Sequence, residues 1–391
     1  MTKIAINALF KASGGSLKNL QSLLRCWEQQ GVLREHQVLL FASPYVARIL
    51  AASPVAGLQV LVLPEADRGM LGRQFAEHVT LPKLLCDHQP DVLFCPGNTV
   101  PRGIRIPTTV VFQNAAPFSS HCGWRRVGLK SWLRFRILAH AVHRASRRAE
   151  RIIVGSNDFA DLLSTSLKLP RQRFTVIPRA VDRDLPNRQA PSGAPLQLPS
   201  RFLLCVSHLQ PYKNIVELVE GFARLRDHTA MQDVQLLIAG GVYTGSRYRE
   251  KIIATIERLG CSDRIQLLGD IQPADIPSLL ARCELFAFPS TCENCPTALM
   301  EALSAGAVIA SSDIGAMPEM AGDAAVYFDP YDPTSIAAAI ERSMTDAELR
   351  RRLQIAARRR ADQLDGHVKT ATRTLRAILE AAVAEPSRQA A

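Results

Sequence analysis

The sequence lacks any apolar run long enough to cross a membrane. No stretch of its 391 residues approaches the roughly eighteen consecutive apolar residues of a spanning helix. The apolar segment 1–7 is too short for the core of a signal peptide. Internal repeats and low-complexity tracts are absent as well. We therefore expect a globular protein of the cytoplasm, and a chain of 391 residues suits two domains that each bury a core.

The cysteines lack the paired spacing of a disulfide framework. Their number, nine, is odd, and they are scattered along the chain. This usage is typical of reduced thiols in the cytosol. Cys292 and Cys295 form a single C-x-x-C pair, whereas a zinc or redox site needs a second pair or a thioredoxin-like context. The sequence therefore predicts no bound metal.

The first glycine-rich loop lacks the spacing of the dinucleotide fingerprint G-x-G-x-x-G, which argues against a dehydrogenase. Instead, two adjacent glycines, Gly14 and Gly15, lie between a first strand and a helical pattern that begins at Leu17. Paired glycines allow positive φ or a close backbone approach to a ligand. They are equally typical of an ordinary strand-to-helix turn.

Apolar runs of strand length alternate with helical patterns along the chain, as a doubly wound parallel sheet requires. A segment rich in proline and small residues, 184–200, suits an interdomain linker. We therefore expect an N-terminal domain over 1–184 and a C-terminal domain over 185–369. The predicted strands are 1–7, 38–41, 58–62, 92–94, 109–112, 152–154 and 174–178, then 201–209, 234–241, 264–271 and 285–288.

Two glutamates, Glu293 and Glu301, lie where the strand 285–288 gives way to an apolar-rich helix. Pro296 suits the first turn of that helix, because proline has a fixed φ and no amide donor. The amides at the helix start would face the carboxyl edge of a parallel sheet, where anionic ligands bind. Carboxylates suit neutral diols, because their two oxygens accept from two adjacent hydroxyls. The segment therefore combines the chemistry of a phosphate site with that of a sugar site.

A second loop with suitable chemistry follows the strand 201–209. Residues 210–214 connect this strand to a helical pattern that begins at Ile215. Lys213 lies in this loop, from which an ammonium can reach a diphosphate beside the helix N-terminus. His208 lies five residues earlier, where a neutral imidazole donates one hydrogen bond. This loop is the second predicted part of the site.

Lys213, Glu293 and Glu301 together resemble the phosphate loop and the E-x7-E signature of retaining GT-B glycosyltransferases, family 4 in particular. The resemblance extends over some hundred and twenty residues. It implies an α/β GT-B fold, in which two Rossmann-like, doubly wound parallel-sheet domains face a central cleft. It also implies that the C-terminal helix, within 370–391, returns to the first domain. The chain departs from the family at His208, where members have arginine, and at Gln113-Asn114, where they commonly have His-Asp.

The resemblance also implies roles for single residues. Lys213, assisted by His208, would bind the donor diphosphate. Glu301 would bind the ribose diol, and Glu293 would bind hydroxyls of the donor sugar. Lys213 and Glu293 are the candidate catalytic residues, acting by charge stabilisation and positioning rather than as nucleophiles. The remaining implied donor or acceptor contacts are Gly14, Gly15, the backbone at Ile271, Asn294, Cys295, Thr297, Gln113 and Asn114.

Asp182-Arg183-Asp184 forms a D-x-D sequence, the pattern with which GT-A transferases hold Mg²⁺ or Mn²⁺. It lies beside the predicted linker and far along the chain from the nucleotide loops. In GT-B proteins a basic side chain and helix amides neutralise the diphosphate. The resemblance therefore implies no metal, and no cofactor besides the nucleotide-sugar substrate.

Positive charge is concentrated in the first half of the chain. Residues 1–190 carry 26 Lys and Arg against 12 Asp and Glu, a net charge of +14, whereas the whole chain has +11. Much of the excess lies in 124–151, where arginines interleave with apolar residues. This pattern is typical of helices on anionic membranes, of a solvated helix with a core face, or of a surface for an acidic glycan. No nucleic-acid module is recognisable, so nucleic acid is not expected as a partner.

The sequence therefore predicts a metal-independent, retaining glycosyltransferase. Its donor would be a UDP- or GDP-linked sugar, and its acceptor a glycan or lipid-linked acceptor of bacterial-type surface polysaccharide or lipopolysaccharide assembly. We expect it on the inner face of the membrane through 124–151. Two alternatives stay open. A catalytically idle GT-B scaffold is favoured by His208 and Gln113-Asn114, and a nucleotide-sugar epimerase would need acid–base residues in the cleft.

Overall fold

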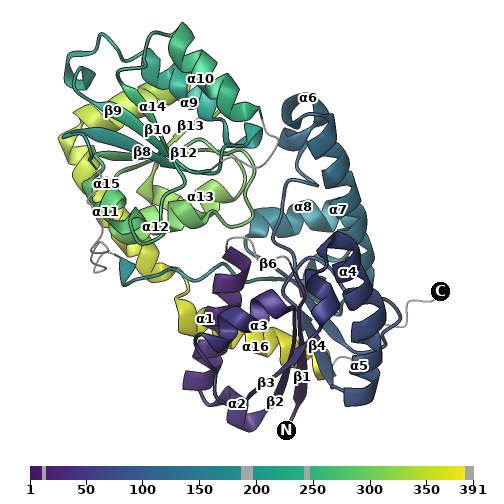
Figure 1. Ribbon diagram of the computed structural model, residues 1–391. Helices are drawn as coiled ribbons and strands as arrows, with labels where there is room; N and C mark the ends of the chain where they lie inside the picture. Colours follow the sequence, from purple (N-terminus) through teal and green to yellow (C-terminus); the bar gives the residue numbers. More distant parts are fainter. Residues whose placement is uncertain (11–14, 186–196, 242–246, 384–391) are drawn as a thin grey trace. The chain divides into compact units, whose positions relative to one another are not determined.

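The computed structural model describes residues 1–10, 15–185, 197–241 and 247–383, which form two compact units (Figure 1). The predicted site residue Gly14 and most of the predicted linker 184–200 lie outside the described residues. The N-terminal unit comprises Met1–Phe118, Arg134–Ala180 and Asp365–Ala391, and the C-terminal unit comprises Ser119–Leu133 and Val181–Leu364.

The N-terminal unit is built on a seven-stranded sheet with the order β3-β2-β1-β4-β5-β6-β7. Every pairing in it is parallel. The strand order reverses between β1 and β4, which creates the crevice at the carboxyl ends of the strands that doubly wound sheets use for ligands. The strands are β1 (Lys3–Ala8), β2 (Gln37–Ala42), β3 (Leu58–Val62), β4 (Val92–Cys95), β5 (Thr108–Val111), β6 (Arg151–Val154) and β7 (Phe174–Val176).

Helices follow most of these strands, and several begin at caps that the sequence supplies. Ser43 Oγ accepts from the amide of Val46, and Ser156 Oγ accepts from the amide of Phe159, so each serine caps a helix start. The helices are α1 (Gly15–Gln29), α2 (Val32–Glu35), α3 (Pro44–Ala51), η1 (Pro64–Asp67), α4 (Gly69–Phe75), the π-helix η2 (Ala76–Thr80), α5 (Leu81–His88), α8 (Asn157–Leu167) and η4 (Arg171–Arg173).

The last described helix, α16 (His367–Val383), belongs to the N-terminal unit, where it packs beside α1 (Figure 1). Trp27 Nε1 donates to the carbonyl of Ala371 at 3.2 Å, and Arg373 Nη2 donates to that of Val176 at 2.6 Å. Ile378 is fully buried in the same apolar cluster as Trp27. The helix α16 therefore completes the apolar core of the N-terminal unit.

The C-terminal unit is built on a six-stranded parallel sheet with the order β10-β9-β8-β11-β12-β13. Successive residues of β8 point into two different cores: Leu203 packs in one apolar cluster and Leu204 in the other. Burial on both faces explains why these strands are continuous apolar runs. The strands are β8 (Phe202–Val206), β9 (Gln235–Ala239), β10 (Ile265–Gly269), β11 (Leu285–Phe288), β12 (Ile309–Ser312) and β13 (Val326–Phe328).

Helices cover both faces of this second sheet, which completes the doubly wound α/β fold that the sequence predicts. The strands β12 and β13 are additions, because no strand was predicted at either place. The helices are η3 (Ser120–Cys122), α6 (Trp124–Val127), η6 (Pro211–Lys213), α9 (Ile215–Ala223), η7 (Thr229–Met231), α10 (Tyr248–Arg258), α11 (Ile276–Arg282), α12 (Thr297–Ala305), α13 (Ala316–Ala321), η8 (Gly322–Ala324), α14 (Pro333–Thr345) and α15 (Ala347–Gln363).

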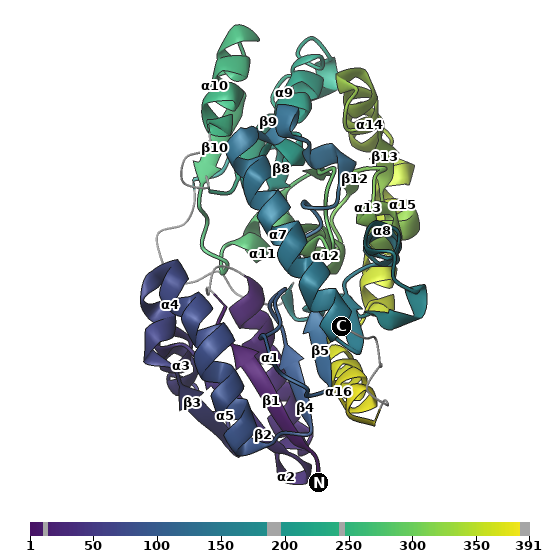
Figure 2. The ribbon, with the colours of Figure 1, turned by 90° about the vertical axis from the view of Figure 1, so that its right-hand side faces the viewer.

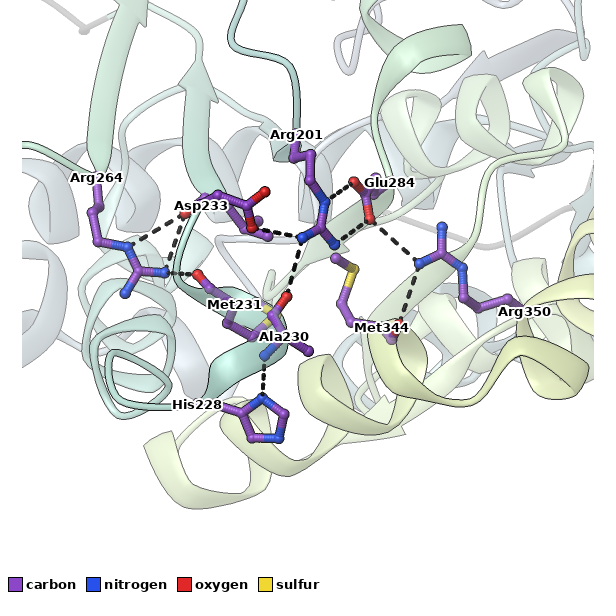
Figure 3. A network of polar contacts seen from close by, with 10 residues as sticks. Arg201, His228, Ala230, Met231, Asp233, Arg264, Glu284, Met344 and Arg350 are labelled. Carbon is purple, nitrogen blue, oxygen red and sulfur yellow. Dashed lines mark hydrogen bonds and ion pairs between the residues drawn. The ribbon is translucent and has the colours of Figure 1, made fainter.

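A polar network ties together the amino-terminal edge of this sheet (Figure 3). Arg201, just before β8, contacts Glu284, just before β11, through Nε–Oε1 at 2.6 Å and Nη2–Oε2 at 3.1 Å. Its Nη1 also contacts Asp233 Oδ1 at 2.6 Å, and Arg350 Nη1 reaches Glu284 Oε2 at 3.4 Å. The hydrogen bond from Arg201 lowers the pKa of Glu284. This network links the starts of three strands to α15.

The contacts assign one segment differently from the sequence-based boundaries. Ser119–Leu133 lies within the predicted N-terminal domain 1–184 but groups with the C-terminal unit, because α6 packs against η6. The next helix, α7 (Leu129–Arg148), is the long helix at the centre of Figure 2. In the part of the chain that the structure describes, neither α7 nor any other helix is long and apolar enough to span a bilayer.

Candidate functional site

The two loops predicted to bind a nucleotide meet at the carboxyl edge of the C-terminal sheet. Their strands, β8 and β11, are adjacent and parallel, with Leu203 opposite Leu285. Thr291 joins the loops, because its amide and its Oγ1 both donate to the carbonyl of Tyr212 at 2.9 Å. The strand order reverses between β8 and β11, so these loops lie where ligands bind open α/β sheets.

Lys213 and Glu293, which are 80 residues apart in the sequence, form an ion pair between Nζ and Oε1. Each side chain is 14% exposed, so the pair is largely removed from water. Ser290 Oγ donates to the same carboxylate oxygen at 2.8 Å. The Nζ atom lies 5.5 Å from the centre of the Tyr212 ring and 5.9 Å from that of Phe288. The structure thus joins the two predicted catalytic residues in a contact that the motif itself does not specify.

Asn214 controls how the Lys213 loop enters the following helix. It adopts the left-handed region at φ 50°, which asparagine tolerates better than most residues, and it is the N-cap of α9. Its side chain is fully buried, and Nδ2 donates to the carbonyl of Pro330 at 2.9 Å. This buried turn fixes Lys213 directly before the N-terminus of α9.

The helix α12 begins at Thr297, directly after Pro296, whose backbone is extended at φ −75° and ψ 90°. Proline has no side-chain acceptor, so Pro296 does not cap the first amides of α12 through its side chain. Glu301 is the fifth residue of α12 and is half-buried. Cys295 is buried, with its Sγ 3.4 Å from Sδ of Met300. Asn294 directly follows Glu293 in the loop that leads into α12.

His208 and Ile271 lie in loops at the same edge. His208 is exposed and follows β8 by two residues, and Ile271 is half-buried two residues after β10. Gly240 is essential to this region, because it has φ 147° and an added Cβ would lie 2.0 Å from the carbonyl oxygen of Ser207. The close approach of these backbones holds the loops after β8 and β9 together.

The C-x-x-C cysteines have separate environments. Cys292 hydrogen-bonds with Cys122 of η3, and this bond together with burial raises the pKa of the Cys292 thiol. Cys295 instead contacts Met300. All nine cysteines of the chain lie in the described residues and are free thiols, and only Cys86 is exposed. Burial raises the pKa of the partly covered Cys283 to about 12.

The implied contacts Gln113 and Asn114 lie in the N-terminal unit, where their amides support the local backbone. Gln113 Nε2 donates to the carbonyl of Pro96 at 2.8 Å, and its own backbone amide donates to Asn98 Oδ1 at 2.9 Å. Asn114 Oδ1 accepts from the amide of Ala116 at 3.0 Å. Of the predicted glycines, Gly15 begins α1. Gln113 therefore joins the loops that follow β4 and β5.

A polar pocket in the N-terminal unit was missed by the sequence analysis. It lies at the carboxyl ends of β1 and β4, and its polar floor is the buried carboxyl group of Glu77 in the π-helix η2. Its lining comes from four separate segments, so no local motif signals it. The polar residues that line it include Asn7, Arg73, Gln74, Glu77, Asn98 and Thr99.

Comparison with known proteins agrees with this architecture. The two α/β units, each built on a parallel sheet, fit the GT-B class of fold. Residues 13–185 match the family described as Glycosyltransferase Family 4, and residues 190–360 match Glycosyl transferases group 1. The chain belongs to this group 1, family 4 class of GT-B glycosyltransferases.

Curated relatives are similar over part of their length. The MMP alpha-(1->4)-mannosyltransferase of Mycolicibacterium hassiacum is 27% identical over 67% of this chain and 60% of that protein. The O-antigen chain mannosyltransferase B of Escherichia coli is 26% identical over 54% of this chain and 56% of that protein. The chain thus spans less than two thirds of the length of either relative.

Solved structures match nearly the whole chain in fold. Alr3699/HepE of Anabaena, in complex with UDP and glucose, has a TM-score of 0.71 and 19% identity over 97% of this chain and all of that one. WaaG, described as a glycosyltransferase involved in lipopolysaccharide biosynthesis, has a TM-score of 0.68 and 16% identity over 95% of this chain and 98% of that one. At these identities the likeness concerns the fold alone.

Proposed function

We propose that the protein is a retaining glycosyltransferase that uses a UDP- or GDP-linked sugar and needs no metal. The observation that carries this proposal is the convergence of Lys213, Glu293 and the start of α12 at one sheet edge. The names of its relatives support an acceptor that is a glycan or a lipid-linked glycan of a surface polysaccharide or lipopolysaccharide.

In the proposed donor site, Lys213 exchanges its carboxylate partner for the diphosphate when the donor binds. Without donor, the ammonium of Lys213 is neutralised by Glu293. A bound diphosphate competes for that ammonium and for the amides at the helix start. Glu293 is then available to accept from hydroxyls of the donor sugar, and Glu301 from the ribose diol. His208, the backbone at Ile271 and the Asn294–Thr297 segment complete the proposed contacts.

Catalysis in this proposal rests on charge stabilisation and positioning. Negative charge accumulates on the diphosphate as the bond to the anomeric carbon breaks. A lysine and helix amides that are fixed before the reaction stabilise this charge more than they stabilise the bound donor. The same groups supply the positive charge that a metal ion supplies in other transferases.

The decisive test is thermal unfolding in the presence of UDP-, GDP- and ADP-sugars. A donor at about a hundred times its Kd stabilises the fold by roughly 2.7 kcal/mol. We expect one nucleotide to stabilise the wild type but neither Lys213→Ala nor Glu301→Ala. Lys251→Ala, which removes an exposed lysine of α10 in the same unit, is the control and should keep the full shift. A shift that survives in both site variants would refute the assignment.

The reaction products separate this proposal from its alternatives. A transferase releases free nucleoside diphosphate slowly from its donor even without an acceptor, because water replaces the acceptor. An epimerase changes the sugar during incubation with the donor, and an idle scaffold changes nothing. Chromatography of the nucleotides and sugars after incubation distinguishes the three outcomes.

We further propose that α7 contacts an anionic membrane surface. Its residues Leu129, Leu133 and Ile137 are 67%, 55% and 67% exposed, and their spacing of four places them on one helix face. The helix has no acidic residue and carries basic residues beside this face. An exposed apolar stripe flanked by cations suits an interfacial helix.

Sedimentation with phosphatidylglycerol vesicles tests this membrane contact. Leu133→Ser with Ile137→Ser should abolish cosedimentation. Ile355→Ser is a matched control, because Ile355 is 60% exposed on the arginine-rich helix α15. Equal binding by all variants would rule out α7 as the docking element.

A further inference from the structure

The two edges of the N-terminal sheet are protected to different degrees. An edge strand has one row of backbone N–H and C=O groups without a strand partner, and such a row can pair with another chain. The edge strands of this sheet are β3 and β7, and β3 lies at the margin of the unit in Figure 2. The strand β3 has five residues, whereas β7 has three. β3 is therefore the longer of the two templates for pairing.

Arginine side chains cover the outer row of β7. The amide of Ile177 donates to β6. Because backbone groups alternate in direction along a strand, those of Phe174 and Val176 point toward the open edge. Arg171 Nη1 donates to the carbonyl of Phe174 at 3.2 Å. Arg373 Nη2 donates to the carbonyl of Val176 at 2.6 Å, so both outward carbonyls of this edge already have a donor.

The outer row of β3 has no such cover. The amide of Leu63 donates to β2 at 2.9 Å. By the same alternation, the backbone groups of Leu58, Val60 and Val62 point toward the open edge. The amide of Leu58 donates to the carbonyl of Val55 at 3.4 Å. Among the residues that the structure describes, no side chain hydrogen-bonds to the backbone of Val60 or Val62.

The side chains of β3 also lack the features that usually discourage pairing at an edge. Charged residues and proline within the strand are the common protection, and β3 contains neither. The whole segment 49–64 has no charged residue, although 21% of the chain is charged. Val60 and Val62 are 40% and 47% exposed, and alternate residues of a strand share a face. The open edge of β3 therefore combines unpaired backbone groups with a row of apolar side chains.

This edge is complementary to itself. If β3 pairs antiparallel with the β3 of a second copy and Val60 lies on the two-fold axis, Leu58 lies opposite Val62 in both directions. Only apolar side chains then meet on that face, and such cross-strand pairs are favourable. The amides of Val60 and Val62 would donate to the carbonyls of Val60 and Leu58 in the second copy. Because the strand is uncharged, two chains of net charge +11 can meet there without placing like charges opposite each other.

We propose that the protein forms a two-fold dimer in which the β3 strands of two copies pair antiparallel and join their N-terminal sheets. This pairing uses the open edge of both copies, and the other edge of the sheet is covered at β7. The association therefore closes at two chains instead of continuing as a filament. The surface lies in the N-terminal unit, and the inference does not depend on the proposed transferase function.

Analytical ultracentrifugation over a concentration series tests the proposal. The wild type should pass from monomer to dimer without larger species. Val60→Lys places two ammonium groups opposite each other at the axis and removes apolar surface from the pairing, so the dissociation constant should rise at least about tenfold. Val368→Lys is the matched control and should dimerise as the wild type does. Val368 is 56% exposed on α16 of the same unit and lies outside the edge.

A backbone variant separates strand pairing from simple apolar contact. Val60→Pro removes an amide that points toward the open edge, and it leaves the amides that donate to β2 in place. This variant should also weaken dimerisation at least about tenfold. Val60→Leu keeps both the amide and an apolar side chain, so it should dimerise as the wild type does. Melting temperatures of the diluted monomers verify that each variant is folded.

Spin labels test which strands meet. Cys86 is the only exposed cysteine of the nine, so the double variant Cys86→Ser, Gln59→Cys accepts one label per chain, on the exposed Gln59 position of β3. In the proposed dimer the two labels flank the axis, and their spectra should show strong dipolar broadening. An excess of unlabelled wild type should remove this broadening, because mixed dimers carry a single label.

The proposal is overturned if the wild type stays monomeric throughout the concentration series. It is also overturned if Val60→Lys and Val60→Pro dimerise as tightly as the wild type, or if Val368→Lys loses the dimer to the same extent. A dimer without dipolar broadening would place the interface elsewhere on the chain. Oligomers larger than two would contradict the closed pairing of β3 with itself.

Discussion

The strands β8 and β11 carry a cation–glutamate pair at each end, and the two pairs differ in design. At the amino-terminal edge, Arg201 contacts Glu284; at the carboxyl edge, Lys213 contacts Glu293. The first pair has additional partners, because Asp233 also binds Arg201 and Arg350 also binds Glu284 (Figure 3). The second consists of one ammonium and one carboxylate, with Ser290 as a further donor.

This difference indicates that the two edges of the C-terminal sheet have different roles. A guanidinium group that donates hydrogen bonds to several acceptors fixes the orientation of those side chains and contributes to the stability of the fold. A single, largely buried contact between a lysine and a carboxylate requires the desolvation of both charges. Another anion of suitable shape can readily replace the carboxylate. We infer that the amino-terminal edge stabilises the fold, whereas the carboxyl edge is arranged for ligand exchange. The following predictions test that division.

The largest effect is expected at Lys213. Lys213→Ala removes the charge that stabilises the leaving diphosphate, so the rate of nucleoside diphosphate release should fall by roughly a hundredfold or more. The rate is measured with the donor that thermal unfolding identifies. Lys251→Ala serves as the control and should retain the wild-type rate. A loss of less than about threefold in Lys213→Ala would place the catalytic charge elsewhere.

Breaking the other pair should affect stability instead. Arg201→Met leaves Glu284 and Asp233 without their shared partner, and we expect the free energy of unfolding to fall by about 2 kcal/mol. Denaturant unfolding measures this change, and the affinity for the nucleotide should stay constant. Arg258→Met is the matched control, because its pair with Glu220 has a 60% exposed arginine and should contribute less than about 1 kcal/mol. If nucleotide affinity falls with Arg201→Met, the two edges are not independent.

A smaller effect is expected at Glu301. Glu301→Gln replaces one acceptor oxygen by an amide donor, so the Kd of the nucleotide should rise about tenfold through the lost charged hydrogen bond to the ribose. The comparison of nucleoside with 2′-deoxynucleoside diphosphates sharpens the test, because the variant should discriminate less between them. Glu257→Gln on α10 is the control and should leave the Kd unchanged.

The smallest effect concerns pH. Because Arg201 lowers the pKa of folded Glu284, this glutamate contributes stability that is fully present above the titration of an unfolded glutamate, near pH ~4.3. That contribution is lost as the pH falls through the lower folded pKa. Urea unfolding between pH 7 and pH 3 should therefore show a shallower acid decline for Glu284→Gln than for wild type, by less than about 1 kcal/mol. Identical slopes would mean that the pair contributes nothing to acid stability.

The sequence predicted most strands because of their burial. Strands such as β8 and β11 are buried on both faces, so they are continuous apolar runs that stand out from amphipathic helices. The short strands β12 (Ile309–Ser312) and β13 (Val326–Phe328) were missed. The GT-B architecture was confirmed, whereas the grouping of Ser119–Leu133 with the C-terminal unit depends on contacts between α6 and η6 that no local pattern encodes.

For the site, the sequence could place residues in loops but could not predict their contacts. Lys213 and Glu293 were each found from the pattern around them, yet their ion pair depends on the adjacency of β8 and β11. The pocket around Glu77 was missed for the same reason. Its polar floor joins Asn7, Glu77 and Thr99 from three distant segments, and each residue is unremarkable in its local sequence.

The uneven burial of the cysteines gives the protein a natural attachment point. Eight of its nine thiols are buried or partly covered, and only Cys86, on α5 of the N-terminal unit, is exposed. The partly covered Cys283 has a pKa near 12, so it supplies almost no thiolate at neutral pH. A maleimide dye should therefore label the unmodified chain at a single position, in the unit that holds the Glu77 pocket. Ligands that enter that pocket could then be followed by fluorescence without replacing any residue.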